Sequence, residues 1–227
     1  MDCEACESGR LRSGLVTHQG INGYKMIKKN KSSKRKVLLF SSLVSSLLPF
    51  TGVGAGELVI DQNSRFSSLI VDVVTESKEF SVELEQGGVA NNLEMVIDSA
   101  LAGSISQVGQ QGSIDLNSAG EAQSLSVSQA GIANTMGLEL IGSVIDVVIE
   151  QSGNSNSIDY SADGDNNTGA IDQSGNDNKL VLNQLGSSNL ANLVQSGSNN
   201  SMNISQYGGG LSLDITQIGN GDTLIIE

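Results

Sequence analysis

The chain has 227 residues, including 27 glycines, one proline and no tryptophan, and only 3% of its residues are aromatic. This composition excludes a core filled with bulky side chains, while 38% hydrophobic residues argue against a fully disordered chain. The formal net charge is −13, and from residue 56 onward 22 acidic residues stand against three basic ones. Such a surface repels phosphate backbones, so the sequence argues against nucleic-acid binding.

The first 25 residues contain both cysteines, Cys3 and Cys6, and the single histidine, His18. A zinc site needs a second pair of ligands, so we expect no metal site. A complete export signal with its own methionine follows this stretch. We therefore interpret residues 1–25 as an over-extended start without a function of its own.

Residues 26–55 have the pattern of a signal peptide. Lysines and an arginine follow Met26, an apolar run extends from Val37 to Phe50, and small residues precede a cleavage site between Ala55 and Gly56. A membrane anchor is the alternative, which the short and serine-rich apolar run disfavours. Residues 56–79 follow as an irregular N-terminal segment with a secretion-targeting role as one interpretation. Its apolar stretch from Leu69 to Val74 predicts a strand that fits no repeat position.

From residue 80 onward the chain repeats with a 22-residue period. A glutamine recurs two positions before a glycine, at Gln107, Gln129, Gln151, Gln173, Gln195 and Gln217. The glycines of this series are Gly109, Gly131, Gly153, Gly175, Gly197 and Gly219, and a second series stands midway between them at Gly120, Gly142, Gly164, Gly186 and Gly208. The repeat is thus built from two equal units, each half a period long.

Within each unit apolar and small polar residues alternate before the glycine, as in Val147, Val148, Ile149 and Glu150. This period of two is typical of half-buried β-strands, and each glycine allows the chain to turn in an arc. The sequence predicts an all-β, two-sheet parallel β-solenoid over residues 80–227, with two strands and two arcs per 22-residue coil and amyloid-like cross-β stacking. Gln107 follows Gln86 one position earlier than the period requires, so one residue is missing from a loop.

By the alternation along the strand, the glutamine before each glycine points inward, to the same side as the apolar residues. A buried amide needs a partner, which its copy in the next coil can supply, so we expect a glutamine ladder on one sheet. On the other sheet the same position reads Ser118, Leu140, Ala162, Gln184 and Gln206, so only Gln184 and Gln206 qualify. Asparagines form further series near the arcs, at Asn134, Asn156, Asn178 and Asn200 and at Asn167 and Asn189.

The run from Asn200 to Gln217 resembles the repeat of the curlin family, whose pattern is S-x5-Q-x-G-x-x-N-x5-Q. Gln206, Gly208 and Gln217 match, whereas Asn200 replaces the serine and Leu211 the asparagine. The similarity recurs in every coil over residues 107–222. It implies an extracellular, cell-surface fibre, the curli fimbrium of a Gram-negative bacterium, which serves adhesion and biofilm formation. Implied partners are copies of the chain itself, the other curlin subunit, an outer-membrane secretion pore and chaperones.

Other classes fit the residues less well. A β-helix polysaccharide-processing enzyme would need clustered cations, but Lys179 is the only cation in the predicted solenoid, and no triad or thiol nucleophile can form after cleavage. We expect no enzyme and no cofactor. A calcium loop at Asp163 to Asn167 lacks the required glycine and glutamate positions. A monomeric β-solenoid adhesin stays open, as does the choice between a major and a nucleating fibre subunit.

Overall fold

The computed structural model describes residues 24–30, 33–39, 45–47, 50–51, 55–65, 68–74, 79–97, 101–119 and 123–227, with side chains for 81–96, 102–119 and 123–227. Cys3, Cys6 and His18 lie outside these residues. In the described part every regular element is a β-strand. Within the same residues, no helix has the length and apolar character that a membrane crossing requires.

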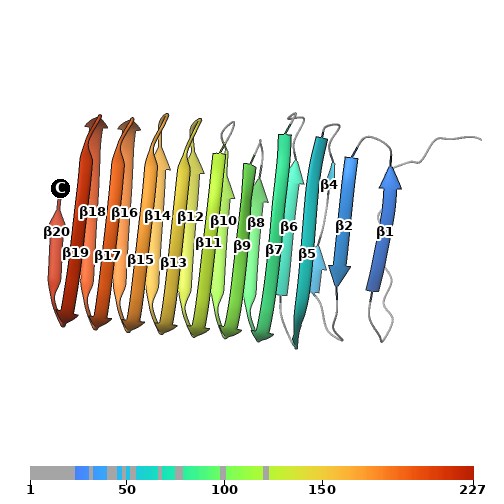
Figure 1. The fold of residues 1–227 in the computed structure, drawn as a ribbon, viewed down its shortest axis with the longest axis horizontal. Coiled ribbons are helices and arrows are strands. Elements are labelled where there is room, and N and C mark those ends of the chain that lie inside the picture. Colours follow the sequence, from blue (N-terminus) through green and yellow to red (C-terminus); the bar gives the residue numbers. More distant parts are fainter. Residues whose placement is uncertain are drawn as a thin grey trace, which may run out of the picture.

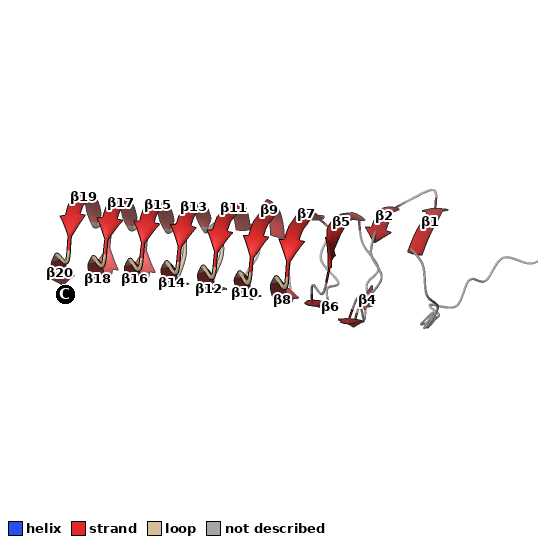
Figure 2. Cartoon of the chain, turned by 90° about the horizontal axis from the view of Figure 1, so that it is seen from below, coloured by secondary structure: helices blue, strands red, loops and turns tan. Residues whose placement is uncertain are grey.

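The strands form two ten-stranded sheets that face each other (Figures 1 and 2). The first sheet contains, in spatial order, β1 (Tyr24–Asn30), β2 (Ser33–Leu39), β5 (Ala55–Arg65), β7 (Glu79–Val89), β9 (Leu101–Gln110), β11 (Gln123–Ile132), β13 (Asp146–Asn154), β15 (Thr168–Asn176), β17 (Leu190–Ser198) and β19 (Ser212–Asn220).

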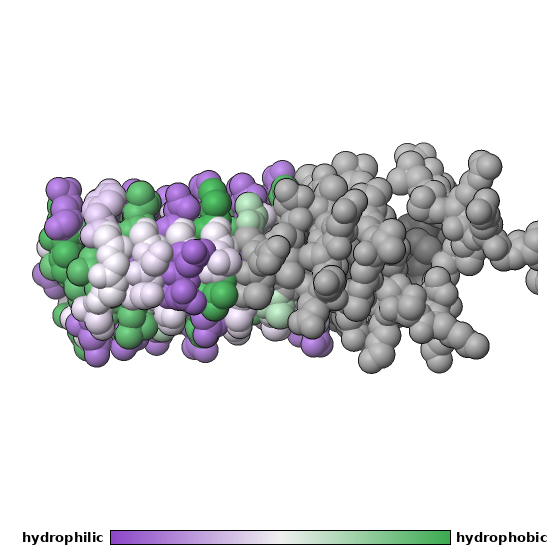
Figure 3. Space-filling view, turned by 90° about the horizontal axis from the view of Figure 1, so that it is seen from above, coloured by the Kyte–Doolittle hydropathy of each residue, from purple (hydrophilic) through white to green (hydrophobic). Residues whose placement is uncertain are grey.

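The second sheet contains the alternate strands. They are β3 (Ser45–Leu47), β4 (Phe50–Thr51), β6 (Ser68–Val74), β8 (Asn92–Ile97), β10 (Ser113–Ser118), β12 (Thr135–Ile141), β14 (Ser157–Asp163), β16 (Lys179–Ser187), β18 (Ser201–Gly209) and β20 (Thr223–Ile226). Arcs from the first sheet to the second form the lower narrow edge in Figure 1, and arcs from the second to the first form the upper edge. Figure 3 looks down on the upper edge.

Neighbouring strands from β5 to β20 are parallel and in register. Gln129, Gln151 and Gln173 pair as Cα partners through β11, β13 and β15, and Gly131, Gly153 and Gly175 do the same. Each partner therefore lies one full coil further along the chain. The predicted fold class, a two-sheet parallel β-solenoid of 22-residue coils, is confirmed.

The solenoid pattern also extends upstream of residue 80. Strand β6 pairs in parallel with β8, so that Leu69 aligns with Leu93 and Val71 with Met95. Leu69 to Val74 therefore occupies a repeat position, in contrast to the prediction from the sequence. The spacing obscured this, because Gln62 of β5 aligns with Gln86, which stands two positions later than the repeat requires.

Both irregular spacings are absorbed in upper arcs. Ile97 aligns with Ser118 and Leu101 with Gln123, so the residue missing between Gln86 and Gln107 is lost between β8 and β9. The two extra residues upstream fall between β6 and β7 by the same comparison. The paired strands keep their register because only the arcs change in length.

Residues of the expected leader contribute β1 to β4. Strand β2 pairs with β5, and the short strands β3 and β4 pair with β6, whereas β1 pairs with β2 in antiparallel orientation. Ala55 and Gly56 are the first two residues of β5. Cleavage between them stays a prediction.

The core is a thin slot filled by alternate side chains of both sheets. Its described members are mostly Leu, Ile, Val and Met, each almost fully buried. The largest is Tyr160 of β14, and the adjacent inward position on β15 is Gly169. A Cβ atom on Gly169 would lie 3.1 Å from Cε2 of Tyr160, so the missing side chain makes room for the ring.

This pairing of sizes predicts that Gly169→Val destabilises the solenoid. The new side chain overpacks the slot against Tyr160, which typically costs about 1–3 kcal/mol. Gly137→Val on β12 is the matched control, because a Cβ there meets no heavy atom within 4 Å. We expect its effect to stay within about 0.5 kcal/mol. Denaturant midpoints of both variants measure the difference, and equal losses would contradict the proposed fit.

Candidate assembly site

A continuous ladder of buried glutamine side chains runs through the first sheet. Each Nε2 donates to Oε1 of the glutamine in the next coil toward the C-terminus. The six steps join Gln86 to Gln107 (2.9 Å), Gln107 to Gln129 (2.8 Å), Gln129 to Gln151 (2.9 Å), Gln151 to Gln173 (2.9 Å), Gln173 to Gln195 (2.7 Å) and Gln195 to Gln217 (2.8 Å).

The same amides also bind the facing strand. Nε2 of Gln151 donates a second hydrogen bond to the carbonyl oxygen of Thr135, 3.1 Å away, and Gln173 binds Ser157 in the same way. Both N–H groups and the carbonyl oxygen of a central ladder residue are therefore occupied. A buried amide whose groups are all paired avoids the desolvation cost of an unmet hydrogen bond.

The second sheet carries a shorter ladder with an unexpected first step. Gln184 donates to Gln206 at 2.9 Å, and the hydroxyl of Tyr160 donates to Oε1 of Gln184 at 2.7 Å. Ala162, which aligns with Gln184, leaves space for this diagonal contact. Burial raises the pKa of Tyr160, with a smaller contribution from Asp146, so the hydroxyl keeps its proton as donor. The sequence pattern did not predict this hydrogen bond, because Tyr160 stands at a repeat position that is otherwise apolar.

Asparagines clamp the lower arcs. Oδ1 of Asn156 accepts the backbone N–H of Asn178 in the next coil at 3.0 Å, and its Nδ2 donates to the carbonyl oxygens of Ser152 and Gly175 at 2.8 Å each. Equivalent bonds are made by Asn134, Asn178 and Asn200. On the upper edge Asn167 and Asn189 bind the next coil similarly.

The arc glycines have positive φ, for example 107° at Gly153. A Cβ atom on Gly153 would collide with the carbonyl oxygen of Gly175, so both conformation and space require glycine. The predicted arc glycines share this conformation at Gly109, Gly131, Gly142, Gly153, Gly164, Gly175, Gly186, Gly197, Gly208 and Gly219. Gly120 lies outside the described residues.

A second left-handed residue follows two positions after most arc glycines, and the sequence analysis did not anticipate it. In the lower arcs it is Ala90, Gln111, Ala133, Ser155, Asp177 or Asn199, with φ between 55° and 58°, or Gly221, with φ 75°. Asn, Asp and Ser are common there, and these residues tolerate the conformation better than bulky ones. The abundance of such residues after the glycines was the available signal.

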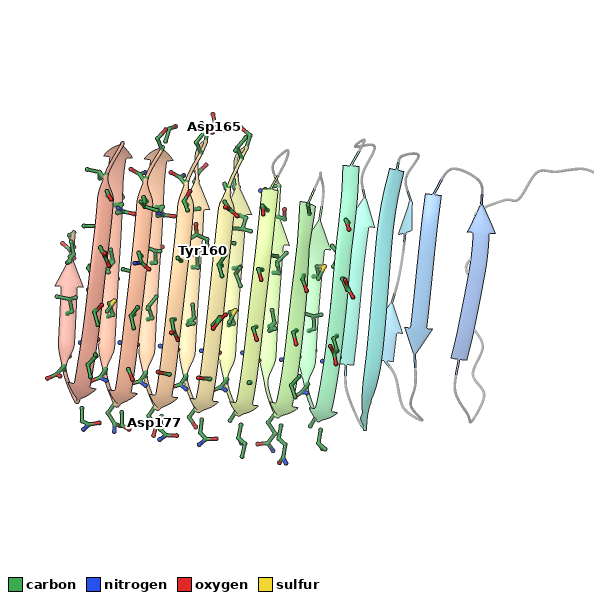
Figure 4. The ribbon with its side chains drawn as sticks, in the orientation of Figure 1. Tyr160, Asp165 and Asp177 are labelled. Carbon is green, nitrogen blue, oxygen red and sulfur yellow. The ribbon has the colours of Figure 1, made fainter. Side chains whose placement is uncertain are left out.

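In the acidic upper arc at Asp163 to Asn167, the carboxylate of Asp165 binds the preceding upper arc. Oδ1 of Asp165 accepts hydrogen bonds from the hydroxyl and the backbone N–H of Ser143, at 2.6 and 3.1 Å. These hydrogen bonds lower the pKa of Asp165. Figure 4 shows Asp165 and Asp177 at opposite narrow edges and Tyr160 between the sheets. Across the described residues, no three His, Cys, Asp or Glu side chains are grouped to hold a metal ion.

The last coil is open at its C-terminal side. Leu213, Ile215, Leu224 and Ile226 are only half-buried, although the equivalent residues one coil earlier, Ala191, Leu193, Met202 and Ile204, are fully buried. Strand β20 covers only Ser201 to Ile204 of β18. The core side chains and strand edges of the last coil are therefore uncovered along the solenoid axis in the described residues.

Comparison with known proteins bears on these coils. The curlin associated repeat matches residues 175–208 and again residues 186–219. The two matches are displaced by half a coil, which equals one strand-and-arc unit. They confirm the resemblance drawn from the run between Asn200 and Gln217. Neither the curated proteins nor the solved structures contain a match to the chain.

Breaking a buried ladder step is expected to destabilise the solenoid more than breaking an exposed one. Gln151→Leu leaves Oε1 of Gln173 without its donor and removes one acceptor from Gln129. Each buried group left without a partner costs about 1–3 kcal/mol. The loss is measured as a shift of the denaturant midpoint.

The control is Asn154→Leu. Asn154 donates to Oδ1 of Asn176 at 2.9 Å across the same one-coil step, but on the exposed edge, where water replaces a lost partner. Ile132 occupies the equivalent position one coil earlier, so an apolar residue fits there. A loss at Asn154 as large as that at Gln151 would show that burial is not the cause.

Proposed function

We propose that this chain is a structural subunit of an extracellular curli-like amyloid fibre, in which copies stack end to end and continue both sheets. The open C-terminal coil carries this proposal. Its inward residues are half-buried in the described structure and become fully buried when another coil covers them, and a second copy of the chain offers coils of the same width and register. The curlin associated repeat in residues 175–219 supports the same function.

Unpaired strand edges favour such stacking. Proteins normally block an edge with charges, proline or a covering loop, because its free N–H and C=O groups pair with other chains. Strand β19 carries Asp214 as its only charged residue, and β20 carries none. Among the residues that the structure describes, Nε2 of Gln217 makes one long hydrogen bond, to Ser201 at 3.4 Å, which leaves one N–H to continue the ladder.

The finer assignments rest on the resemblance. We propose export through an outer-membrane pore with the help of chaperones, a nucleating or client relation to another curlin subunit, and a role in adhesion and biofilm formation. The complete ladder on the first sheet fits a fibre-forming subunit, whereas the single glutamine step from Gln184 to Gln206 on the second sheet fits a looser, nucleating one. The alternative of a monomeric adhesin needs a covered end.

A charge placed at the open core is expected to stop fibre growth. Ile226→Lys puts an ammonium group among the half-buried side chains of the last coil, and covering it without a partner costs several kcal/mol, about 3–5. Growth of fibres from preformed seeds, followed by thioflavin fluorescence, should slow at least about tenfold. Fibre diffraction of the parent should show spacings of about 4.8 and 10 Å.

Ile225→Lys is the matched control, because Ile225 is adjacent in β20 but points outward and is 60% exposed. Both variants add the same charge at the same end of the chain. Undiminished growth of the Ile225 variant separates blocked stacking from general repulsion. A parent chain that stays folded and monomeric even with seeds would refute the fibre proposal and favour the adhesin.

The second test concerns processing. We expect the secreted product to begin at Gly56, because Val53 and Ala55 supply the small residues that signal peptidase requires. N-terminal sequencing of secreted material identifies the first residue, and Ala55→Asp should prevent cleavage while Glu57→Asp should not. A secreted species that retains Cys3 would contradict the proposed leader.

A further inference from the structure

The upper edge carries an exposed group of apolar side chains, which we call the apolar edge. Its members are Ile141, Val144, Leu185, Leu190 and Tyr207. They lie in or beside the arcs that join the second sheet to the first, and their exposed fractions range from 39% to 62%. Figure 3 shows apolar surface on this edge beside small and polar residues. The polar interruption at Asp163, Asp165 and Asn166 belongs to one coil only.

The lower edge differs over the same coils. Its arcs carry asparagine, serine and aspartate, as in Asn154-Ser155, Asn176-Asp177 and Ser198-Asn199. Exposed apolar residues of the lower edge stand in the earlier coils, at Val89, Val108 and Ile132, and beside the last arc, at Ile218. The two narrow edges of the solenoid are therefore chemically distinct.

Three members of the apolar edge, Leu185, Leu190 and Tyr207, lie in a stretch of the chain without charged residues. No charged residue occurs between Lys179 and Asp214, so β16, β17 and β18 present an uncharged surface beyond Lys179. The rest of the solenoid is strongly acidic. Two such acidic bodies repel each other almost everywhere, and this band is where close approach leaves the fewest like charges facing each other.

Val144 adds an independent observation. Its φ is 55°, a left-handed conformation in which a β-branched residue is a genuine outlier. The corresponding residues of the next three coils are Asn166, Ser188 and Gly210, which suit that conformation. Val144 is 51% exposed, so packing within the subunit does not compensate for the strain. An apolar side chain at this position therefore points to a contact outside the subunit.

The size of the apolar edge indicates what covers it. Five side chains exposed to this degree offer on the order of 500 Å², which is the size of the largest patch on many monomers. A stable pair of proteins buries about 800 Å² on each partner, so two single subunits fall short. In a fibre the patch recurs in every subunit, and a partner with the same strand spacing of about 4.8 Å stays in step along its whole length.

We infer that the apolar edge is the lateral contact between two fibres of this chain, so that the fibres associate in bundles edge to edge. The inference rests on the proposed fibre function and adds to it a surface that end-to-end stacking does not use. Because the contact is apolar and the fibres are acidic, added salt strengthens it by screening the repulsion. A contact made by ion pairs would weaken instead.

The test compares two double variants of the full chain. Leu185→Ser with Tyr207→Ser removes apolar surface from the upper edge, and Val108→Ser with Ile132→Ser removes a similar amount from the lower edge. Growth is followed by thioflavin fluorescence, and fibre width by electron microscopy at low and high salt. We expect both double variants to grow at the parental rate, and the bundled fraction of the upper-edge variant alone to fall at least about tenfold.

Val144→Asn separates lateral contact from structure. It should raise the denaturant midpoint of the subunit, because asparagine tolerates the left-handed conformation, and at the same time reduce bundling. The inference fails if both double variants bundle equally, if salt disperses the bundles, or if parental fibres stay single. The upper-edge variant could instead lose binding to zwitterionic vesicles while bundling stays unchanged. That result would assign the apolar edge to lipid and overturn the inference. A parent without fibres refutes the proposed function as well.

Discussion

Stacking in register is the constraint on which this solenoid depends. Because each coil repeats the previous one at a fixed step, a buried polar group has its own copy as nearest neighbour, and it is satisfied only if that copy supplies the opposite group. A primary amide has both a donor and an acceptor, so glutamine and asparagine suit these positions, and every ladder step lies between 2.7 and 2.9 Å. The same repetition forces the described arc glycines from Gly88 to Gly197, since a Cβ there would meet the carbonyl group of the next arc.

Much of this arrangement could be read from the sequence. The spacing of the Gln-x-Gly pairs is sufficient to predict the coil length, the inward columns and the partners in the ladder, since periodicity and register are the same information in a parallel stack. The pattern could not place Leu69 to Val74, because two extra residues in an upper arc shift the spacing while leaving the strand in register. It also could not supply the bond from Tyr160 to Gln184, which runs diagonally between columns and depends on the small residues Ala162 and Gly169.

The demands on the sequence differ between the parts of the coil. Inward positions are restricted to a few apolar residues and amides, whereas outward positions vary freely, as Glu150, Asp172, Val194 and Thr216 do within one column. The proposed assembly along the axis would use backbone and inward residues, so it would be insensitive to most surface changes. Contacts to the side depend on the outward residues, and the upper and lower edges have diverged in polarity within the same architecture.

The direction of the hydrogen bonds also determines how such an assembly bears load. Strand-to-strand bonds and amide ladders run along the long axis, so a pull along this axis loads all bonds of a coil together. Inside a subunit the covalent chain winds from coil to coil through the arcs and resists the same pull. Between two stacked subunits only hydrogen bonds and packing contacts would cross the junction. The junction would therefore be the mechanically weakest plane. A proposed fibre under tension would therefore break there, and each break would leave two fresh ends that are chemically identical to the original ones.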